Sequence, residues 1–314
     1  MIVSITGGTG FIGHKLVMKH LALGDSVRVL SRRSLSEAGI PDSVKLYHGD
    51  LSKSSDLFPF VDGADLLYHC AGEIRDNLRM HSIHVDGTVR LIHAAKGRIG
   101  RWVQLSSAGA YGRRREGNIT ELSELRACGT YEVSKVECEN LVRTAASQGT
   151  FEYTILRPSN VYGLEMRNKS IFNLMAMIQQ RIFFLIGKPG SIANYIHIND
   201  FVDALLLIGT SPHANGQIYN LSDHLLMEQF VSVIADSLGV PRPSIRLPEL
   251  PIRIAAKLLE GIPKFPLTEA RVDALTGRAI YISDKIKLQL NYNQNISIKE
   301  GLDELVKFYL VSTR

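Results

Sequence analysis

A tyrosine, a lysine and a serine are the residues of this sequence whose types and spacing could carry acid–base chemistry. Tyr131 and Lys135 are four residues apart at the start of a predicted helix, so they share one of its faces. A phenol can exchange a proton with a substrate oxygen when a nearby positive charge favours the phenolate. Ser107 ends a predicted strand over residues 101–107, and its hydroxyl could hold the same oxygen. Taken alone, the Tyr-x-x-x-Lys pair could also belong to a solvated helix face. The catalytic interpretation therefore depends on the other motifs in the chain.

The first thirteen residues supply that context. Residues 1–6 read as a short buried strand, the run Gly7-Gly8-Thr9-Gly10-Phe11-Ile12-Gly13 follows, and residues 14–23 have the apolar spacing of a helix. Glycine permits a tight turn and lets a diphosphate approach the backbone N–H groups, which the positive end of the helix favours. This order is typical of a dinucleotide-binding fingerprint, with an ordinary strand-to-helix turn as the alternative.

The second predicted strand, residues 25–30, ends where such a fold selects its cofactor. It is followed by Ser31-Arg32-Arg33, with no acidic residue. An acid would bind the adenosine ribose hydroxyls, whereas an arginine can bind a 2′-phosphate through its guanidinium group. The sequence therefore favours NADP(H) over NAD(H), although arginines that point to solvent would remove the distinction. Asp50, in the predicted strand 44–51, lies where it could contact the adenine amino group.

Strands alternate with helices through the first half of the chain. Further strands are predicted at 65–72, 101–107 and 151–156, and helices at 80–95 and 131–146. This alternation predicts an α/β fold with a Rossmann-type, doubly wound parallel sheet, whose ligands lie beyond the carboxyl ends of the strands. We expect an NAD(P)-binding domain of residues 1–162 plus about 194–222. A smaller substrate-binding lobe would comprise residues 163–193 and 223–314.

Composition restricts the class of protein further. The 314 residues are 45% hydrophobic with a formal net charge of +5, and the positive residues are scattered, so we expect no nucleic-acid partner. The longest apolar runs, such as residues 204–208, are too short to cross a bilayer, and the first strand leaves no room for a signal peptide. Cys70, Cys128 and Cys138 have no metal-type spacing. We therefore expect a cytoplasmic protein with reduced thiols and no metal site.

Five segments taken in order resemble the extended short-chain dehydrogenase/reductases, and within them the NAD(P)-dependent nucleotide-sugar epimerase/dehydratase family. They are residues 6–13, Ser107 with Tyr111-Gly112, Tyr131-x-x-x-Lys135, residues 156–163 and residues 195–200. The resemblance covers nearly the whole chain. It implies an oxidoreductase that transfers a hydride between a nicotinamide cofactor and its substrate, and a homodimer paired through the helices near residues 80–96 and 131–146.

The resemblance also assigns roles to individual residues. Ser107 would polarise the substrate, Tyr131 would be the acid/base, and Lys135 would tune Tyr131 and hold the nicotinamide ribose. Asn160 matches a position that contacts the substrate diphosphate, and a turn asparagine is an equal alternative. The predicted cofactor-binding residues are Gly7, Thr9, Gly10, Phe11, Ile12, Gly13, Arg32, Arg33, Asp50, Leu51, Ala71, Gly72, Tyr131, Lys135, Pro158 and Val161.

Three departures from the family pattern bear on the reaction. Ala108-Gly109 stands where the 4,6-dehydratases carry an Asp-Glu pair, so the acid and base for water elimination are missing. Ala193-Asn194 stands where many sugar epimerases carry an arginine that clamps the diphosphate. His84 stands where the family usually has asparagine.

The leading hypothesis is therefore 4-keto reduction or 4-epimerisation of a nucleoside-diphosphate sugar, and the arginines that would suit NADPH favour reduction. One alternative is an NADPH-dependent reductase of a small apolar ketone, flavonoid- or steroid-like, which the missing arginine slightly favours. The other is a non-catalytic cofactor-binding relative, and the intact serine, tyrosine and lysine set argues against it.

Overall fold

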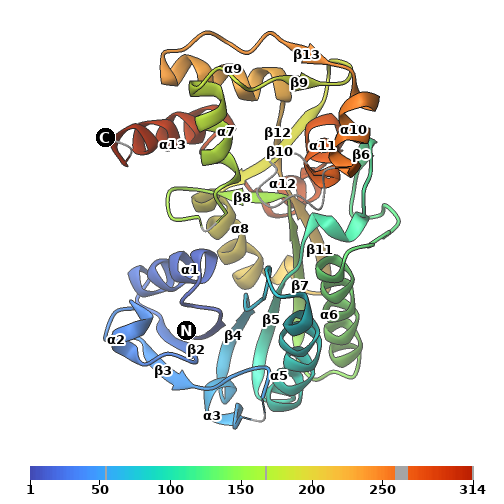
Figure 1. The fold of residues 1–314 in the computed structure, drawn as a ribbon. Coiled ribbons are helices and arrows are strands. Elements are labelled where there is room, and N and C mark those ends of the chain that lie inside the picture. The colour runs from blue at the N-terminus through green and yellow to red at the C-terminus, as the bar shows by residue number, and fades with distance from the viewer. Residues whose placement is uncertain (54, 167, 259–267, 313–314) are drawn as a thin grey trace.

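A seven-stranded parallel sheet forms the centre of the molecule (Figure 1). The computed structural model describes residues 1–53, 55–166, 168–258 and 268–312. The strands lie in the order β11-β7-β5-β4-β1-β2-β3, and each is parallel to its neighbours. Their bounds are β1 Ile2–Thr6, β2 Ser26–Ser31, β3 Lys45–His48, β4 Ala64–His69, β5 Ile99–Leu105, β7 Glu152–Pro158 and β11 Gln217–Leu221. The predicted doubly wound parallel sheet is confirmed.

The strand order reverses between β1 and β4. The chain runs from β1 outward to β2 and β3, then returns to β4 and continues outward to β5, β7 and β11 on the other side. At the carboxyl ends, Thr6 of β1 pairs in register with His69 of β4. The glycine turn after β1 and the segment after β4 therefore meet at the place where ligands bind in sheets of this type.

Helices cover both faces of the sheet, so the central strands β1, β4 and β5 are buried along most of their length. On one face, α1 (Phe11–Ala22), α8 (Ile198–Thr210) and α12 (Asp284–Leu290) pack into one hydrophobic core with β1 and β2. On the other face, α3 (Phe58–Val61), α5 (Gly87–Ala95) and α6 (Thr130–Ser147) pack around Trp102, which is fully buried. Short helices α2 (Leu35–Ala38) and η3 (Pro212–Ala214) lie in connections.

The continuous helix predicted over residues 80–95 is wrong in one respect. The helix α4 (Asn77–His81) passes into a π-helical turn, η1 (Ser82–Asp86), before α5 begins at Gly87. Side chains support the widened turn, because the His84 carbonyl oxygen accepts hydrogen bonds from Thr88 Oγ1 at 2.5 Å and Cys138 Sγ at 3.2 Å. Turns of this kind are frequent at functional sites.

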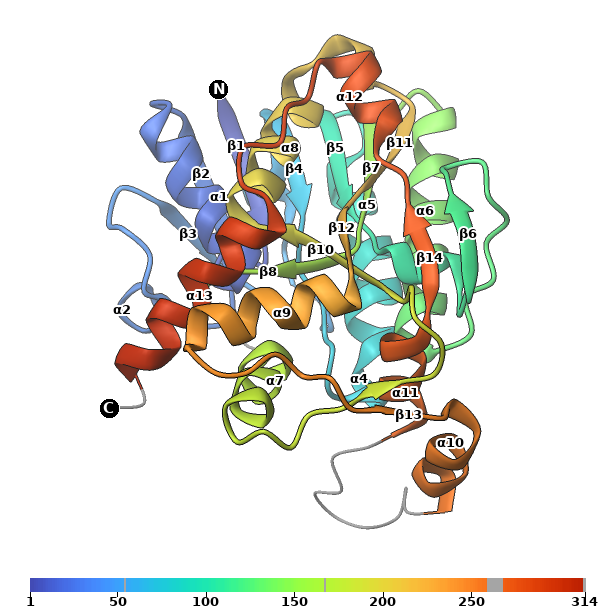
Figure 2. The same ribbon diagram turned by 90° about the horizontal axis from the view of Figure 1, so that it is seen from above.

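The C-terminal lobe lies beside the carboxyl ends of the strands and has its own core, formed by α7, α9 and α13 (Figure 1). Figure 2 shows α9 and α13 next to each other and α10 at the edge of the lobe. The helices are α7 Ser170–Gln179, α9 Met227–Leu238, α10 Glu249–Leu258, α11 Glu269–Thr276 and α13 Ile298–Ser312. The strands are β8 Asn160–Tyr162, β9 Leu185–Ile186, β10 Ile192–His197, β12 Asp223–Leu226, β13 Arg246–Leu247 and β14 Arg278–Tyr281.

Strand pairings outside the large sheet connect segments that are far apart in the chain. β10 pairs with β8 in parallel and with β12 in antiparallel orientation. β14 pairs with β6 (Glu116–Ile119), so a strand from the first half of the chain lies beside a strand of the lobe. Within residues 194–222, β11 joins the large sheet and α8 packs on it, while β10 belongs to the small sheet. The exact division into two domains stays a prediction, and residues 259–267 of the lobe lie outside the described ranges. No helix in the described ranges is long and apolar enough to span a membrane.

Candidate active site

A cavity of about 210 Å³ lies where the strand order reverses. It is lined by many of the residues predicted to bind a cofactor, namely Gly7, Thr9, Gly10, Arg32, Arg33, Asp50, Leu51, Ala71 and Gly72. They come from the carboxyl ends of β1, β2, β3 and β4. The fold thus gathers residues from four separate segments around one opening.

The backbone of the glycine turn fits a diphosphate. Gly7 has a φ of +71°, and a Cβ built on it would lie 2.8 Å from the Ala71 nitrogen, so only glycine suits this position. The Gly10 N–H closes the turn on the Gly7 carbonyl oxygen at 2.9 Å, and α1 then begins without a side-chain cap. A helix N-terminus left open in this way is a suitable place for phosphate oxygens. Gly13 is buried, and a Cβ there would overlap the Gly7 carbonyl, so it lets α1 pack close to the turn.

The charged residues of the cavity lie where the sequence predicts them. Arg32 and Arg33 are exposed, and neither forms an ion pair among the described residues. Asp50 Oδ1 accepts hydrogen bonds from the Ser52 N–H at 2.9 Å and the Ser52 hydroxyl at 2.8 Å. Partial burial alone would raise the pKa of Asp50, but these hydrogen bonds and the charges of Arg32 and Lys53 hold it below its usual range.

Seven predicted cofactor residues do not line this cavity, namely Phe11, Ile12, Gly13, Tyr131, Lys135, Pro158 and Val161. Phe11 and Ile12 begin α1, and their side chains pack against the hydrophobic core. Pro158 is the buried last residue of β7, and Val161 lies in β8 with its side chain against the core. Contacts from these residues to a cofactor stay predictions.

Tyr131 and Lys135 lie on one face of α6, and Lys135 Nζ is 5.7 Å from the centre of the Tyr131 ring. Lys135 is 4% exposed and donates a hydrogen bond to the Leu105 carbonyl oxygen at 3.1 Å. Ser107, two residues after Leu105, caps the short 3₁₀ helix η2 (Ala108–Tyr111), because its Oγ accepts the Gly109 N–H at 3.0 Å. That bond uses a lone pair, so the serine keeps its own O–H for a ligand.

Gly72 lies between the residues that line the cavity and the pair of Tyr131 and Lys135. A Cβ built on Gly72 would lie 3.6 Å from Lys135 Nζ, and Gly72 lines the cavity. The lysine ammonium therefore lies at one edge of this cavity, and the glycine turn forms another edge. A cavity lined by a turn that fits phosphates, with a buried lysine at its edge and a tyrosine beside that lysine, suits nicotinamide chemistry.

The model of the NAD dependent epimerase/dehydratase family matches residues 3–222. This chain belongs to that family. A ketoreductase from Stigmatella aurantiaca, which acts on 4-hydroxy-2-methyl-3-oxo-4-farnesyl-3,4-dihydroquinoline-1-oxide, is 25% identical over 96% of this chain and 94% of its own length. A 3beta-hydroxysteroid-dehydrogenase/decarboxylase from Arabidopsis thaliana is 24% identical over 96% of this chain and 78% of its own. The structure of the UDP-glucuronic acid 4-epimerase from Bacillus cereus in complex with NAD superposes over 100% of both chains with a TM-score of 0.76 and 17% identity.

Membership in the epimerase/dehydratase family confirms the predicted relationship to the extended short-chain dehydrogenase/reductases. The family's fold and its NAD-dependent chemistry agree with the cavity at the sheet reversal. The substrate has to be inferred from the parts of this chain that face away from the cofactor.

A buried charge network behind Ser107 was not predicted from the sequence. Arg157 and Glu139, 3% and 1% exposed, form a bidentate pair with distances of 2.9 and 2.6 Å. Ser106 Oγ donates to Glu139 at 2.5 Å, Arg157 donates to the Tyr111 hydroxyl at 2.9 Å, and that hydroxyl donates to Asn220 Oδ1 at 2.7 Å. Burial would lower the pKa of Arg157, but the hydrogen bonds and charge of Glu139 raise it. The only sequence signal was an arginine at the end of an apolar strand.

A second cavity, of about 220 Å³, lies between the lobe and the turn that follows Ser107. Tyr281 lines it and stacks on Tyr111 of η2, with the ring centres 6.1 Å apart. Its wall combines the large apolar side chains of Leu174, Ile192, Tyr195, Met227, Phe230 and Leu275 with the polar side chains of Arg114, Asn160, Asn194 and Asp273. The predicted substrate residue Asn160 lies in its lining, and its Nδ2 donates to the Asn194 carbonyl oxygen at 3.1 Å. Asn160 thus links β8 to β10 as well as facing the cavity.

Arg114 is the arginine in this lining, and it belongs to the run Arg113-Arg114-Arg115, for which the sequence favours a solvated loop over contact with an anionic substrate. Its side chain is 24% exposed and donates to the Glu124 carbonyl oxygen at 2.9 Å. Its Nε is buried and has no hydrogen-bond partner within the described ranges. By contrast, Arg113 and Arg115 are more than half exposed, as the prediction of a solvated loop requires.

Proposed function

We propose that this protein is an NAD(P)-dependent oxidoreductase that interconverts a ketone and a secondary alcohol on a predominantly apolar substrate. The observation that carries the proposal is the apolar wall of the second cavity, next to the turn that begins at Ser107. This favours the alternative hypothesis of the sequence analysis over the nucleotide-sugar hypothesis. An apolar molecule gains binding energy from such a wall in proportion to the area it buries.

The polar groups of the second cavity support the same conclusion. Asn194 Nδ2 donates to the Ala279 carbonyl oxygen at 2.9 Å, and Asp273 binds Arg253 at 2.8 Å, so both are engaged within the protein. Ala193 occupies the place of the diphosphate-clamping arginine of many sugar epimerases and is buried. Arg114 also lines the cavity, but its guanidinium group donates to the Glu124 carbonyl oxygen and lies 3.9 Å from the Glu124 carboxylate.

Two other arginines of the lobe are engaged outside this lining. Arg246 forms an ion pair with Glu228 at 2.6 Å, and Arg278 donates to the Pro189 carbonyl oxygen at 2.9 Å. A sugar diphosphate carries two negative charges that need such partners when they leave water. Arg114 is the one cationic side chain among the described residues that line the second cavity, which weakens the case for a nucleotide sugar.

In the reductive direction, the chain's own residues handle the proton. Ser107 donates a hydrogen bond to the substrate carbonyl oxygen and holds it beside Tyr131. The Tyr131 phenol then gives its proton to that oxygen as it becomes an alkoxide, and the Lys135 ammonium stabilises the phenolate that remains. A bound nicotinamide supplies the hydride in this direction and accepts it in the other. Lys135 has two donors left after its bond to Leu105, and these suit the ribose hydroxyls of the cofactor.

NADP(H) is the cofactor we propose, because Arg32 and Arg33 lie exposed at the end of β2 on the rim of the cavity. Two guanidinium groups can bind a 2′-phosphate, and no acid of β2 is present to bind the ribose hydroxyls. NAD(H) is the alternative, and the solved epimerase structure of the family contains it.

The proposal is tested by following NADPH oxidation with a panel of apolar ketones, such as 3-ketosteroids, alongside a UDP-4-keto sugar. We expect turnover of at least one apolar ketone and none of the UDP-sugar. Tyr131→Phe should lower kcat by about 10²–10⁴-fold, since general acid–base catalysis contributes about that much. Conversion of the UDP-sugar alone would overturn the substrate assignment, and unchanged turnover in Tyr131→Phe would overturn the mechanism.

Nucleotide-sugar reduction or epimerisation is the second candidate. It is favoured by the similarity to the UDP-glucuronic acid 4-epimerase and by Asn160 and Arg114 in the second cavity. Dehydration is not favoured, because Ala108 and Gly109 follow Ser107.

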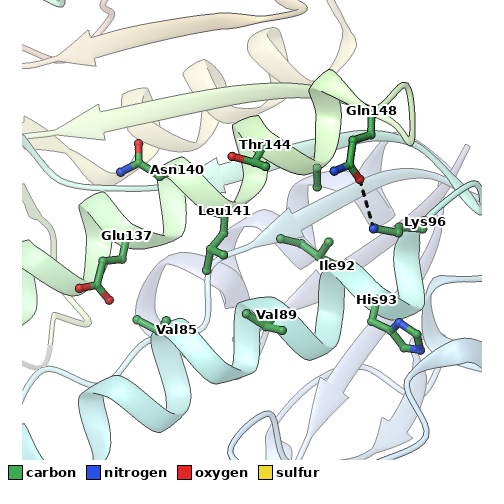
Figure 3. A pocket seen from close by; sticks show the side chains of 11 residues that line it. Val85, Val89, Ile92, His93, Lys96, Glu137, Asn140, Leu141, Thr144 and Gln148 are labelled. Atoms are coloured by element: carbon green, nitrogen blue, oxygen red, sulfur yellow. Dashed lines mark hydrogen bonds between the residues drawn. The ribbon is translucent and has the colours of Figure 1, made fainter.

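We also propose that two copies pair through α5 and α6, as the family resemblance implies. Figure 3 shows the side chains of Val85, Val89 and Ile92 facing those of Leu141 and Thr144 across the groove between the two helices. The groove has a volume of about 550 Å³, and Val89 is 48% exposed. Apolar side chains left open along two adjacent helices fit a four-helix interface with the same helices of a second copy. A location in the cytoplasm stays a prediction.

A further inference from the structure

His84 lies between the rim of the dinucleotide cavity and the start of the helix that carries Tyr131. It is 1% exposed and belongs to the π-helical turn η1. Its Nε2 accepts the Glu73 N–H at 2.7 Å, and its Nδ1 lies 2.7 Å from Ser134 Oγ. Ser134 Oγ in turn donates to the Tyr131 carbonyl oxygen at 2.8 Å. One side chain thus connects the loop after β4 with the first turn of α6.

The hydrogen bonds determine which nitrogen of His84 carries the proton. Because Nε2 accepts a backbone N–H, it carries no hydrogen in the neutral ring, and the proton lies on Nδ1. Nδ1–H therefore donates to Ser134 Oγ, and the serine O–H is used on the Tyr131 carbonyl. This chain of donors ends on a carbonyl oxygen, which has no proton to pass on, so it is not a proton path to the Tyr131 phenol.

The ring of His84 also touches the tyrosine directly. The two rings meet edge to face, with centres 5.7 Å apart and an interplanar angle of 76°. Such a contact restricts the orientation of the phenol ring. The backbone of Tyr131 is held through Ser134 and its ring through the imidazole, so both parts of the tyrosine depend on His84.

On the cavity side, His84 holds a loop that a cofactor has to contact. Gly72 and Glu73 line the cavity, and a Cβ on Gly72 would lie 3.2 Å from His84 Nε2. Glu73 Oε1 accepts the N–H groups of Ile74 and Arg75, both at 2.9 Å, which makes the loop an ordered turn. The position of this turn relative to α6 is set by the bond from the Glu73 N–H to His84.

The surroundings of the imidazole keep it neutral, as the bond from the Glu73 N–H to Nε2 requires. Burial and then the positive charge of Lys135 lower the pKa of His84 to about 3, against a smaller opposite effect of the Glu73 carboxylate. The other groups in contact with its carbonyl, Thr88 and Cys138, are uncharged partners.

We propose that His84 is a positioning residue that links the rim of the dinucleotide cavity to the placement of Tyr131. The link has two separable halves, one to the Glu73 N–H and one through Ser134 to Tyr131. The inference rests on the proposed roles of the cavity and of Tyr131, and it assigns His84 no contact with the substrate and no proton transfer.

Two substitutions separate the halves. An asparagine amide nitrogen lies near the place of Nδ1, so His84→Asn keeps the donor to Ser134 and loses the acceptor for Glu73. A glutamine carbonyl oxygen reaches nearer the place of Nε2, so His84→Gln keeps the acceptor and loses the donor. His213→Asn, an exposed histidine of η3, is the control for removing a histidine.

Dinucleotide affinity is measured by calorimetry and turnover by NADPH oxidation. We expect His84→Asn to weaken NADPH binding about tenfold with a near-parental kcat, and His84→Gln to lower kcat about tenfold with near-parental binding. Equal effects of the two variants on both quantities, or no effect, would overturn the link. Thermal melting of each variant identifies a general loss of folding.

A measurement on the unaltered protein keeps the inference testable if a variant does not fold. Long-range ¹H–¹⁵N spectra should show His84 as the neutral form protonated at Nδ1 near pH 7, and a proton on Nε2 would overturn the inference. The calorimetry and the spectra need no substrate. If the parent binds NADPH and reduces no ketone, the proposed function fails, while these readouts still decide the role of His84.

Discussion

Lys135 Nζ lies 5.7 Å from the centre of the Tyr131 ring and also binds the carbonyl oxygen of Leu105, the last residue of β5. A single ammonium group therefore connects the acid–base candidate on α6 to the strand that leads into Ser107. The bond to Leu105 fixes the lysine head group, so its charge stays close to the phenol, and no carboxylate of the described residues forms an ion pair with it.

Removal of this charge should slow the chemical step. We predict that Lys135→Met lowers kcat by about 10²-fold, within the range for acid–base catalysis, because the phenolate loses its neighbouring cation. Lys135→Arg keeps the charge in a larger group and is the matched comparison, with activity between those of the parent and Lys135→Met. A parental kcat in Lys135→Met, measured at saturating NADPH and substrate, would exclude the proposed role.

The glycine turn predicts a difference between two glycines with similar backbones. Gly7 and Gly24 have φ values of +71° and +79°, but a Cβ on Gly24 meets nothing within 4 Å, whereas one on Gly7 meets the backbone of Ala71. Gly24→Ala should cost about 1–2 kcal/mol of unfolding free energy from the backbone alone. Gly7→Ala should cost about 1–3 kcal/mol more and abolish dinucleotide binding. Urea denaturation and calorimetry measure both, and equal losses of stability would contradict the close approach to Ala71.

Arg32 and Arg33 should determine the choice of dinucleotide. We predict that Arg32→Ala or Arg33→Ala weakens NADPH binding about tenfold, which is about 1.4 kcal/mol, and leaves NADH binding unchanged. Arg98→Ala, at the far end of the sheet next to β5, is the control. If the parent binds NADH more tightly than NADPH and neither substitution matters, the two arginines are surface residues and NAD(H) is the cofactor.

Acid should destabilise the fold through two buried histidines. Burial, followed by the charge of Lys135, lowers the pKa of His69 to about 3, and the pKa of His84 is lowered to the same value. Since each unfolded histidine titrates near about 6.5, the unfolded chain binds more protons below that pH. The stabilisation is therefore complete above about pH 6.5 and is lost as the pH falls toward 3.

We predict that the unfolding free energy decreases between pH 6.5 and pH 5 by up to about 1.4 kcal/mol per pH unit for each of these histidines. His84→Asn should reduce the slope, whereas His213→Asn, which removes an exposed histidine, should leave it unchanged. Urea titrations at several pH values provide the measurement, and a pH-independent unfolding free energy over this interval would contradict the neutral, buried state.

The α5–α6 groove predicts an effect on assembly. Val89→Arg should convert a dimer into a monomer in light scattering, because a charge would be placed among apolar side chains of the interface. Leu288→Arg is the matched control, since Leu288 is 81% exposed on α12. A parent protein with the mass of one chain would rule out the dimer under the conditions used.

Those parts of the fold that depend on local sequence could be predicted. The strand, glycine turn and helix around Gly7 and Gly10 follow from residues that are neighbours in the chain, and so does the shared helix face of Tyr131 and Lys135. Alternating strands and helices then predict the parallel sheet, because few other arrangements satisfy such a pattern.

Features that depend on distant partners could not be predicted. The apolar strand near residues 194–198 pairs with β8 and β12 outside the large sheet, and its own pattern contains no sign of which partner it takes. The π-helical turn is supported by Thr88 and Cys138 and is invisible in the apolar spacing of residues 80–95. The position of Arg114 in the second cavity likewise depends on a lobe that folds from the other end of the chain.

The bidentate pair of Glu139 and Arg157 has a consequence for how this enzyme could acquire new substrates. Through Ser106, Tyr111 and Asn220 it joins α6, the carboxyl end of β5, η2 and the last strands of the sheet. Loss of either charge would leave its partner buried and unpaired, at about 3–5 kcal/mol. The wall of the second cavity touches that network through the stacking of Tyr281 on Tyr111, and the other lining residues named above form no hydrogen bond with it. Substitution of residues in this wall can therefore change which ligand is preferred, while the hydrogen-bonded network around Ser107 is kept. The same reaction can then be applied to different molecules.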